Sequence, residues 1–193
     1  MKNNRIKVIL LGESGVGKTN LINVTVGEKF NENEETTFAS CFVEKVYKIN
    51  NKEYTLNIWD TIGQERFRQL TKLFFKDSKI VILVYDKSFK QTFVELNYWK
   101  EEIKNLLGND IVIGVVGNKD DKDDSDNDVD EGEARAFAKS IDAKFTMASA
   151  KINGKGFSDF LKELLIYYIR KTQGKLQKNE TIVLHKKIIK KKK

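Results

Sequence analysis

The glycine-rich stretch Gly12–Thr19 has the residue types and the spacing of a loop that binds nucleotide phosphates. Its pattern, G-x-x-x-x-G-K-[S/T], lets backbone N–H groups surround the phosphate oxygens while a lysine reaches the β- and γ-phosphates. The apolar run Ile6–Leu11 before it predicts a strand, and a helical pattern from Lys18 to about Gly27 follows it. Strand, loop and helix start are the context that the motif requires, and a helix N-terminus favours an anion. The predicted phosphate-binding residues are Ser14, Gly15, Val16, Gly17, Lys18, Thr19 and Asn20.

A second polar segment begins at Asp60, directly after another predicted strand. The Asp60 carboxylate and the Thr19 hydroxyl supply the oxygen atoms that Mg²⁺ prefers. The Gly63 N–H can contact a γ-phosphate, and the Gln64 amide can orient an attacking water. An isolated segment of this kind is also compatible with a polar turn, but beside a phosphate loop it predicts nucleotide hydrolysis.

Two loops near the other end of the chain predict that the base is guanine. In the pattern Asn-Lys-x-Asp, the Asp121 carboxylate can accept hydrogen bonds from guanine N1–H and N2–H₂. Adenine lacks this pair of donors, so the carboxylate would be left unpaired and adenine is disfavoured. The Ala150 N–H can donate to the guanine O6. The predicted base-binding residues are Asn118, Lys119, Asp121, Ser149, Ala150 and Lys151.

Length and composition limit the class of protein. The chain has 193 residues, of which 40 % are hydrophobic, as expected for one α/β domain and a short appendage. No apolar run approaches the ~18 residues of a membrane-spanning helix. The N-terminus leads directly into the first predicted strand, so we expect no signal peptide. With Cys41 as the single cysteine, an internal disulfide is excluded and a cytosolic location is expected.

The net charge of +7 belongs to the end of the chain. Residues 172–193 contain eight lysines and one acidic residue, which leaves 27 basic and 27 acidic residues in 1–171. The main domain is therefore neutral, and nucleic acid is not an expected partner. We predict a globular domain over 1–171 and a flexible lysine-rich tail over 172–193.

Strand and helix patterns alternate along residues 1–171. The predicted strands are Ile6–Leu11, Cys41–Ile49, Glu53–Trp59, Ile80–Tyr85, Ile111–Val116 and Lys144–Met147. The helical patterns include Lys18–Gly27, Thr92–Leu107, Ala134–Ile141 and Phe157–Ile169. This order predicts an α/β three-layer sandwich with five helices and a six-stranded, mostly parallel sheet that contains one antiparallel hairpin pair. Each chemical motif follows a predicted strand, so the motifs are expected to meet at the carboxyl edge of the sheet.

The motifs together resemble the Rab family of Ras-superfamily small GTPases. The resemblance covers nearly all of residues 5–171 and includes the stretches Tyr54–Trp59, Arg66–Thr71, Phe74–Ser78 and Leu83–Asp86. It implies a P-loop GTPase fold that binds GTP or GDP with Mg²⁺. It also implies a switch that hydrolyses GTP and controls vesicle traffic through nucleotide-dependent binding of effectors, with an endocytic role suggested by Ala39.

The resemblance also implies roles for particular residues. Phe30 would pack on the guanine, and Thr37 would close on Mg²⁺ and the γ-phosphate as part of switch I (31–41). The metal ligands would be Thr19, Thr37 and Asp60. The catalytic residues would be Gln64, Lys18, Thr37 and Gly63, of which Gly63 and Gln64 belong to switch II (61–76). The effector surface would be formed by Phe42, Trp59 and Phe74.

Regulation by other proteins is expected. Switch I contains no arginine that could stabilise the transition state in cis, so intrinsic hydrolysis should be slow and a GTPase-activating protein should act in trans. An exchange factor and effectors complete the expected partners of a monomer. The expected location is cytoplasmic or peripheral on the cytosolic face of endomembranes.

Three features depart from the family pattern. Ile62 stands where the family has alanine, and switch I reads Thr37-Phe38-Ala39-Ser40-Cys41-Phe42. Residues 172–193 contain no cysteine for prenylation, although their lysines favour weak contact with an anionic membrane. A disordered tail, a truncated chain and a nuclear-localisation signal are alternative explanations for this segment. Two alternative functions are a slow or non-cycling GTP-bound scaffold and a soluble Ran-like GTPase.

Overall fold

The computed structural model describes residues 4–35, 37, 41–61, 63, 68–108, 111–122, 125, 127–152 and 154–191. Six strands form one sheet in the order β2-β3-β1-β4-β5-β6. Their bounds are β1 Arg5–Leu11, β2 Cys41–Ile49, β3 Lys52–Asp60, β4 Ile80–Asp86, β5 Val112–Asn118 and β6 Lys144–Met147. Only β2 and β3 pair antiparallel within this sheet, which confirms the predicted mixed sheet.

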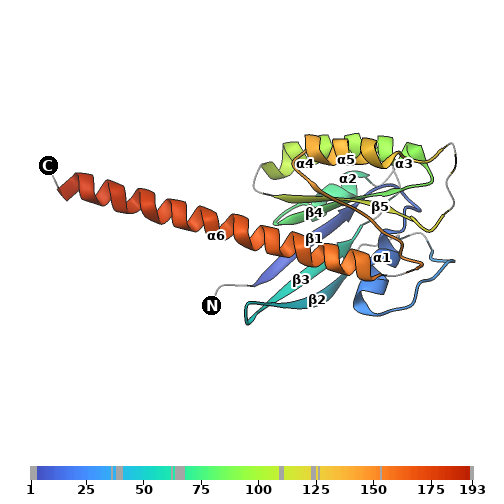
Figure 1. Ribbon diagram of the computed structural model, residues 1–193, viewed down its shortest axis with the longest axis horizontal. Helices are drawn as coiled ribbons and strands as arrows, with labels where there is room; N and C mark the ends of the chain where they lie inside the picture. The colour runs from blue at the N-terminus through green and yellow to red at the C-terminus, as the bar shows by residue number, and fades with distance from the viewer. Residues whose placement is uncertain are drawn as a thin grey trace.

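Helices cover both faces of the sheet, as Figure 1 shows. Their bounds are α1 Lys18–Val26, α2 Arg68–Thr71, η2 Lys72–Phe74, α3 Lys90–Val94, α4 Leu96–Leu107, α5 Glu131–Ser140 and α6 Lys155–Lys191. Helices α1 and α6 pack on one face, and α4 and α5 pack on the other. The predicted three-layer α/β sandwich is therefore confirmed.

The central strands are apolar because both of their faces are covered. All seven residues of β4 are buried, and six of the seven residues of β5 are buried. A strand in this position cannot alternate polar and apolar residues without burying the polar ones. The continuous apolar runs seen in the sequence follow from this constraint.

The β2–β3 hairpin has a two-residue turn at Asn50 and Asn51. Both residues have positive φ angles, 49° and 60°, which is the backbone of a type I′ turn and is better tolerated by asparagine than by most residues. The ladder pairs Ile49 with Lys52 at the turn and Cys41 with Asp60 at the far end. The two switch segments are therefore attached to opposite strands of one hairpin.

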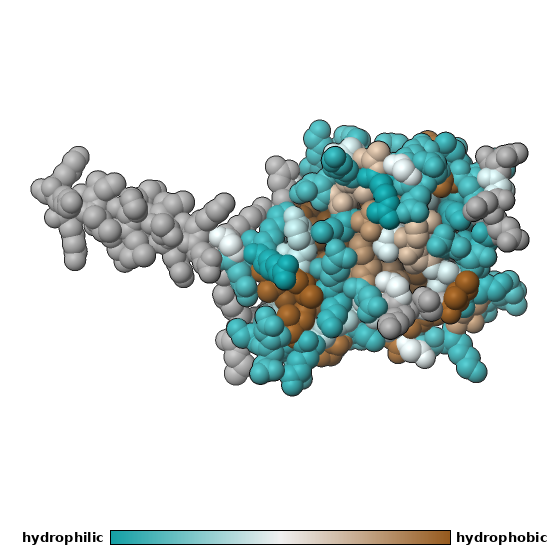
Figure 2. Space-filling model, viewed as in Figure 1, coloured by the Kyte–Doolittle hydropathy of each residue, from teal (hydrophilic) through white to brown (hydrophobic). Residues whose placement is uncertain are grey.

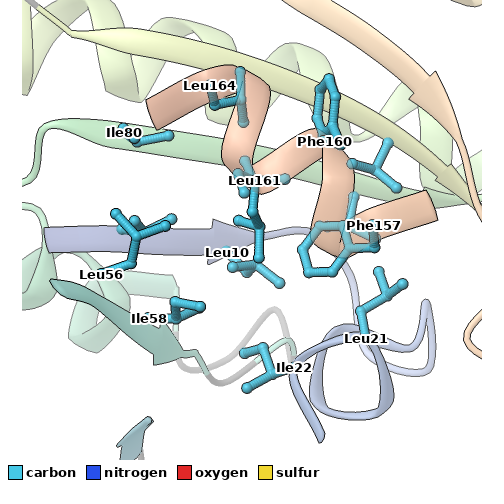
Figure 3. Close-up of a cluster of buried hydrophobic side chains, with 14 of the residues drawn as sticks. Leu10, Leu21, Ile22, Leu56, Ile58, Ile80, Phe157, Phe160, Leu161 and Leu164 are labelled. Carbon is cyan, nitrogen blue, oxygen red and sulfur yellow. The ribbon is translucent and has the colours of Figure 1, made fainter. Parts of the chain in front are cut away.

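Helix α6 completes the larger of the two hydrophobic cores. Figure 3 shows its apolar side chains meeting those of the sheet and of α1. The fully buried members from α6 are Phe157, Leu161, Leu164 and Leu165. On the face shown in Figure 2, hydrophilic side chains predominate around smaller hydrophobic areas. Within the described residues, no helix has the length and apolar character needed to cross a membrane.

Two helices differ from the sequence patterns. The pattern over Thr92–Leu107 is divided at Glu95 into α3 and α4, and Leu96, Trp99 and Ile103 of α4 face the core. Helix α6 continues through 172–191, where the sequence predicted a flexible tail. The division of the chain at residue 171 remains a prediction.

Replacing Leu161 with alanine is expected to lower the free energy of unfolding by about 2–5 kcal/mol, because Leu161 is fully buried between α6 and the sheet. Leu106→Ala is the matched control, since this leucine is 50 % exposed and should change stability by about 0.5 kcal/mol or less. Urea unfolding at constant GDP and Mg²⁺ concentrations measures both values. Equal losses for the two variants would contradict the packing described here.

Candidate nucleotide-binding site

The predicted site residues surround a cavity of about 390 Å³ at the carboxyl edge of the sheet. Its volume is in the range of small-molecule sites. The predicted residues that line it are Ser14, Gly15, Gly17, Lys18, Thr19, Asn20, Phe30, Thr37, Gly63, Asn118, Lys119, Asp121, Ala150 and Lys151. Val16, Asp60 and Ser149 lie just behind the wall and hydrogen-bond to residues that line it.

The phosphate loop requires glycine where other groups approach it closely. Gly17 has a φ of 92°, and a Cβ atom placed there would lie 2.4 Å from Asn118 Nδ2. A larger residue would therefore be strained and would also displace Asn118. A Cβ atom on Gly63 would lie 2.5 Å from Lys18 Nζ and 2.7 Å from the Ser14 nitrogen. Switch II thus lies against the phosphate loop at Gly63.

Lys18 places a buried ammonium group in the centre of this loop. Its side chain is 6 % exposed, and Nζ donates to the carbonyl oxygens of Gly12 and Glu13 at 2.9 Å each. Burial lowers the pKa of Lys18 to about 8, although Asp60 and Glu13 oppose this shift. The charged form is therefore only partly stabilised by the protein. An anion at the loop would stabilise it further.

Three oxygen-bearing side chains meet beside Lys18. The Thr19 hydroxyl donates to Asp60 Oδ2 at 2.7 Å and lies 3.0 Å from the Thr37 hydroxyl, which itself donates to Oδ2 at 3.3 Å. Asp60 Oδ1 is buried and has no hydrogen-bond partner within the described part of the chain. Burial also raises the pKa of Asp60, against the opposing effect of Thr19 and Lys18. This set of hard oxygen donors fits Mg²⁺, which is held by few protein ligands.

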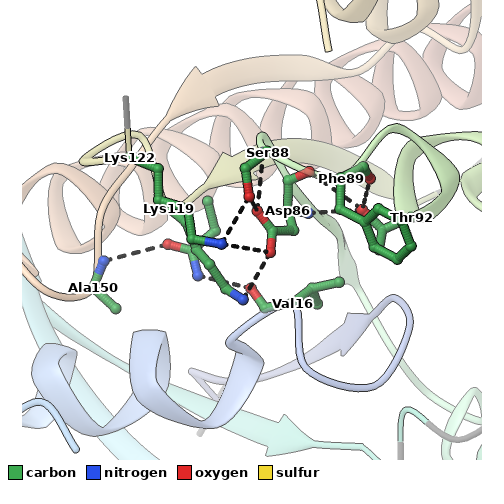
Figure 4. A network of polar contacts seen from close by, with 9 residues as sticks. Val16, Asp86, Ser88, Phe89, Thr92, Lys119, Lys122 and Ala150 are labelled. Atoms are coloured by element: carbon green, nitrogen blue, oxygen red, sulfur yellow. Dashed lines mark hydrogen bonds and ion pairs between the residues drawn. The ribbon is translucent and has the colours of Figure 1, made fainter. Parts of the chain in front are cut away.

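Asn118 joins the phosphate loop to the base-binding loops. Its Nδ2 atom donates to the Val16 carbonyl at 2.8 Å, and its Oδ1 atom accepts from the Ala150 N–H at 3.3 Å (Figure 4). The Ser149 hydroxyl donates to Asp121 Oδ1 at 2.5 Å. Asp121 lines the cavity and keeps acceptor capacity beyond this contact, while its role in binding the base remains a prediction.

Asp86 lies near the site but belongs to neither the phosphate-binding nor the base-binding motifs. Its Oδ2 atom lies 2.7 Å from Lys119 Nζ, and its Oδ1 atom accepts hydrogen bonds from the Ser88 hydroxyl and N–H (Figure 4). Burial alone would raise the pKa of Asp86, but these hydrogen bonds lower it. Lys122 Nζ donates to Ser88 Oγ at 2.8 Å and extends the network. Asp86 thus holds the lysine of the base-binding motif in place.

The three predicted effector residues form one aromatic surface outside the cavity. The Phe42 and Trp59 rings are stacked with centroids 5.0 Å apart, and the Trp59 and Phe74 centroids are 5.5 Å apart. Phe42 is 48 % exposed, so this surface is accessible and is more than sheet-face core. Phe42 and Trp59 are also direct cross-strand neighbours in the hairpin.

Two residues of interest, Ile62 and Gln64, lie outside the described residues. The catalytic role of Gln64 and the effect of Ile62 therefore remain predictions. The Asn20 side chain is described, but its amide hydrogen-bonds to the backbone of Asn31. Asn20 lines the cavity, as predicted, but the phosphate-loop motif does not specify its contact with Asn31.

Comparisons with known proteins agree with this geometry. Residues 7–169 match the model of the Ras family. The chain is 40 % identical over 158 residues to the Ras-related protein Rab-21 of Mus musculus, an alignment that covers 82 % of this chain and 70 % of the relative. The Homo sapiens protein of the same name is also 40 % identical, with 82 % and 69 % covered. The Dictyostelium discoideum protein of that name is 36 % identical over 168 residues, with 87 % and 78 % covered.

Binding of GDP is expected to be accompanied by proton uptake near pH 8. Phosphate should raise the lowered pKa of Lys18, so the complex holds a proton that the free protein has partly lost. With a pKa of about 8 in the free protein, uptake should be about half a proton at pH 8 and about a tenth at pH 7. Nucleotide affinity should therefore fall as the pH rises through 8.

Calorimetric titration of nucleotide-free protein in buffers of different ionisation enthalpy measures this uptake. Asp121→Ala should weaken binding but leave the uptake unchanged, because we assign Asp121 to the base and Lys18 to the phosphates. Proton release at pH 8, or equal uptake at the two pH values, would contradict the assignment to Lys18.

Proposed function

Because the chain belongs to the Ras family and is a Rab-like small GTPase of membrane traffic, we propose that it alternates between a GTP-bound and a GDP-bound form. In this proposal the aromatic surface of Phe42, Trp59 and Phe74 binds effectors in the GTP-bound form. The protein acts as a monomer, and an exchange factor and a GTPase-activating protein control its two transitions.

The observation that carries this proposal is the contact of both switches with the phosphate loop. Thr37 of switch I reaches Thr19 and Asp60, and Gly63 of switch II lies against Lys18. Groups at these positions can respond to the presence of a γ-phosphate and can separate when it is lost. The hairpin then transmits the change, because Phe42 follows switch I and Trp59 precedes switch II.

The proposed mechanism assigns each residue a physical task. Thr19, Thr37 and Asp60 would hold Mg²⁺, which when bound neutralises charge on the β- and γ-phosphates. The Lys18 ammonium stabilises charge that develops on the transferred phosphoryl group. The Gly63 N–H contacts a γ-phosphate oxygen, and the Gln64 amide orients the attacking water. Asp121 and Ala150 select guanine, and the Phe30 ring covers it.

We propose that hydrolysis is slow without an activating protein. Single-turnover hydrolysis by the purified protein should therefore proceed far below one per second, and an activator should accelerate it by about 10³–10⁵-fold. Intrinsic turnover near one per second would contradict this proposal. The absence of hydrolysis even with a Rab-activating domain would favour the alternative of a GTP-bound scaffold.

Replacing Ile62 with alanine should accelerate hydrolysis or nucleotide exchange severalfold. A Cβ atom on the neighbouring Gly63 would already meet Lys18, so we expect switch II to have little free space here. The β-branched side chain of Ile62 has few rotamers with which to adapt. Val46→Ala is the control, since Val46 is 55 % exposed and lies away from the cavity. Unchanged rates of hydrolysis and exchange in Ile62→Ala would exclude an effect of Ile62.

We further propose a peripheral location on the cytosolic face of endomembranes, with weak contact between the lysines of 172–193 and anionic lipid. Each lysine near such a surface contributes about 1 kcal/mol before screening. Flotation with anionic liposomes should recover the protein at low salt and much less at high salt. The variant with Lys190–Lys193 changed to glutamine should float less. Absence of flotation at low salt would contradict the membrane contact.

A further inference from the structure

Asn20 makes a buried contact that ties helix α1 to the start of switch I. Its side chain is 8 % exposed, so little of it reaches solvent. Nδ2 donates to the Asn31 carbonyl at 2.9 Å, and the Asn31 N–H donates to Oδ1 at 2.9 Å. Both polar atoms of the amide are thus engaged with the backbone of a single residue. We refer to this pair of hydrogen bonds as the Asn20–Asn31 clasp.

The clasp acts on a segment that has little other support. Between α1 and β2, the described residues contain no helix or strand. Asn31 directly follows Phe30, whose ring lines the cavity and packs against the larger core. Holding the backbone at Asn31 therefore limits the positions that the Phe30 ring can take.

Other contacts of this segment are exposed or conditional, among them a hydrogen bond from the Asn33 N–H to Asn31 Oδ1 at 3.0 Å. Lys151 Nζ and Glu32 Oε1 lie 3.5 Å apart, but their side chains are 54 % and 77 % exposed, and exposed ion pairs contribute little. Thr37 is held by Thr19 and Asp60, a contact that depends on the groups that bind metal and γ-phosphate. The clasp involves neither, so it should persist in both nucleotide states. A buried amide with both partners satisfied is also costly to open.

We propose that Asn20 is a positioning residue that sets the rate of guanine nucleotide release by holding Phe30 over the cavity in both nucleotide states. This inference rests on the proposed contact of Phe30 with the guanine. It gives the Asn20 side chain a task that does not involve direct contact of its amide with the nucleotide.

Replacing Asn20 with alanine should accelerate the release of fluorescently labelled GDP by about tenfold, which corresponds to about 1.4 kcal/mol. Release of a labelled non-hydrolysable GTP analogue should accelerate by a similar factor. Thr37→Ala should instead accelerate release of the GTP analogue more than release of GDP. Stopped-flow displacement by excess unlabelled nucleotide measures all of these rates at fixed Mg²⁺.

Two variants separate the clasp from a general loss of stability. Asn31→Ala removes the exposed hydrogen bond from the Asn33 N–H but keeps both backbone groups of the clasp, so it should leave GDP release close to that of the unaltered protein. Thr25→Ala removes a buried hydroxyl that donates to Leu21 O within the same helix and does not contact Asn31. If Thr25→Ala lowers the thermal midpoint as much as Asn20→Ala and accelerates release equally, the positioning role is overturned.

Phe30→Ala distinguishes failure of this inference from failure of the proposed base contact. If Phe30→Ala accelerates release and Asn20→Ala does not, the clasp has no role in release, while the base contact stands. If neither does, the proposed contact of Phe30 is wrong and the inference fails with it. If both do, the double variant should release GDP no faster than Phe30→Ala alone, because the clasp acts through Phe30. If the two substitutions had additive effects on the rate of GDP release, Asn20 would not act through Phe30.

Discussion

The ammonium group of Lys18 is the charge on which the arrangement of the site depends. It is removed from water and surrounded by carbonyl oxygens of its own loop, which supply partial charges only. A cation in this environment is unfavourable unless anionic groups approach it. Asp60 supplies one such group from β3, and in the proposed function a polyphosphate supplies the others. Phosphate binding and the position of β3 are consequently linked through one side chain.

The sheet brings these groups together because its strands end at one edge. The phosphate loop follows β1, Asp60 ends β3, Asp86 ends β4 and Asn118 ends β5. Strand order places β1 between β3 and β4, so the loop lies between the residues proposed to hold the metal and those proposed to orient the base. Hydrogen bonds from Asn118 then join the two halves. The cavity is therefore a product of topology as much as of the individual motifs.

The sequence predicted residues that line the cavity because the motifs for phosphate and guanine recognition have fixed residue types at short spacing. The phosphate loop and Asp121 could be assigned in this way, and strand periodicity placed them at one sheet edge. Asp86 was not assigned, because its partner Lys119 is distant in sequence and no local pattern marks the ion pair. The Asn20–Asn31 clasp was not predicted either, because its two residues lie eleven positions apart and no local pattern marks the contact.

Helix boundaries were the less predictable part of the fold. The break at Glu95 was not visible, since apolar residues on both sides continue the same helical stripe. The helical pattern was predicted only to Ile169 while α6 continues to Lys191, because a lysine-rich composition is shared by helices and disordered segments. Local composition alone does not specify either boundary.

The β2–β3 ladder also restricts how this chain can vary in length. Successive residues of a strand lie on opposite faces, so one residue added inside β2 would reverse the face of every residue on one side of it. Such a change would separate Phe42 from Trp59 or Cys41 from Asp60, which pair in the present register. Residues added at the Asn50–Asn51 turn would leave that register intact. The hairpin can therefore accept insertions at its distal tip, while a single insertion along a strand must form a bulge if the present pairing is to be kept.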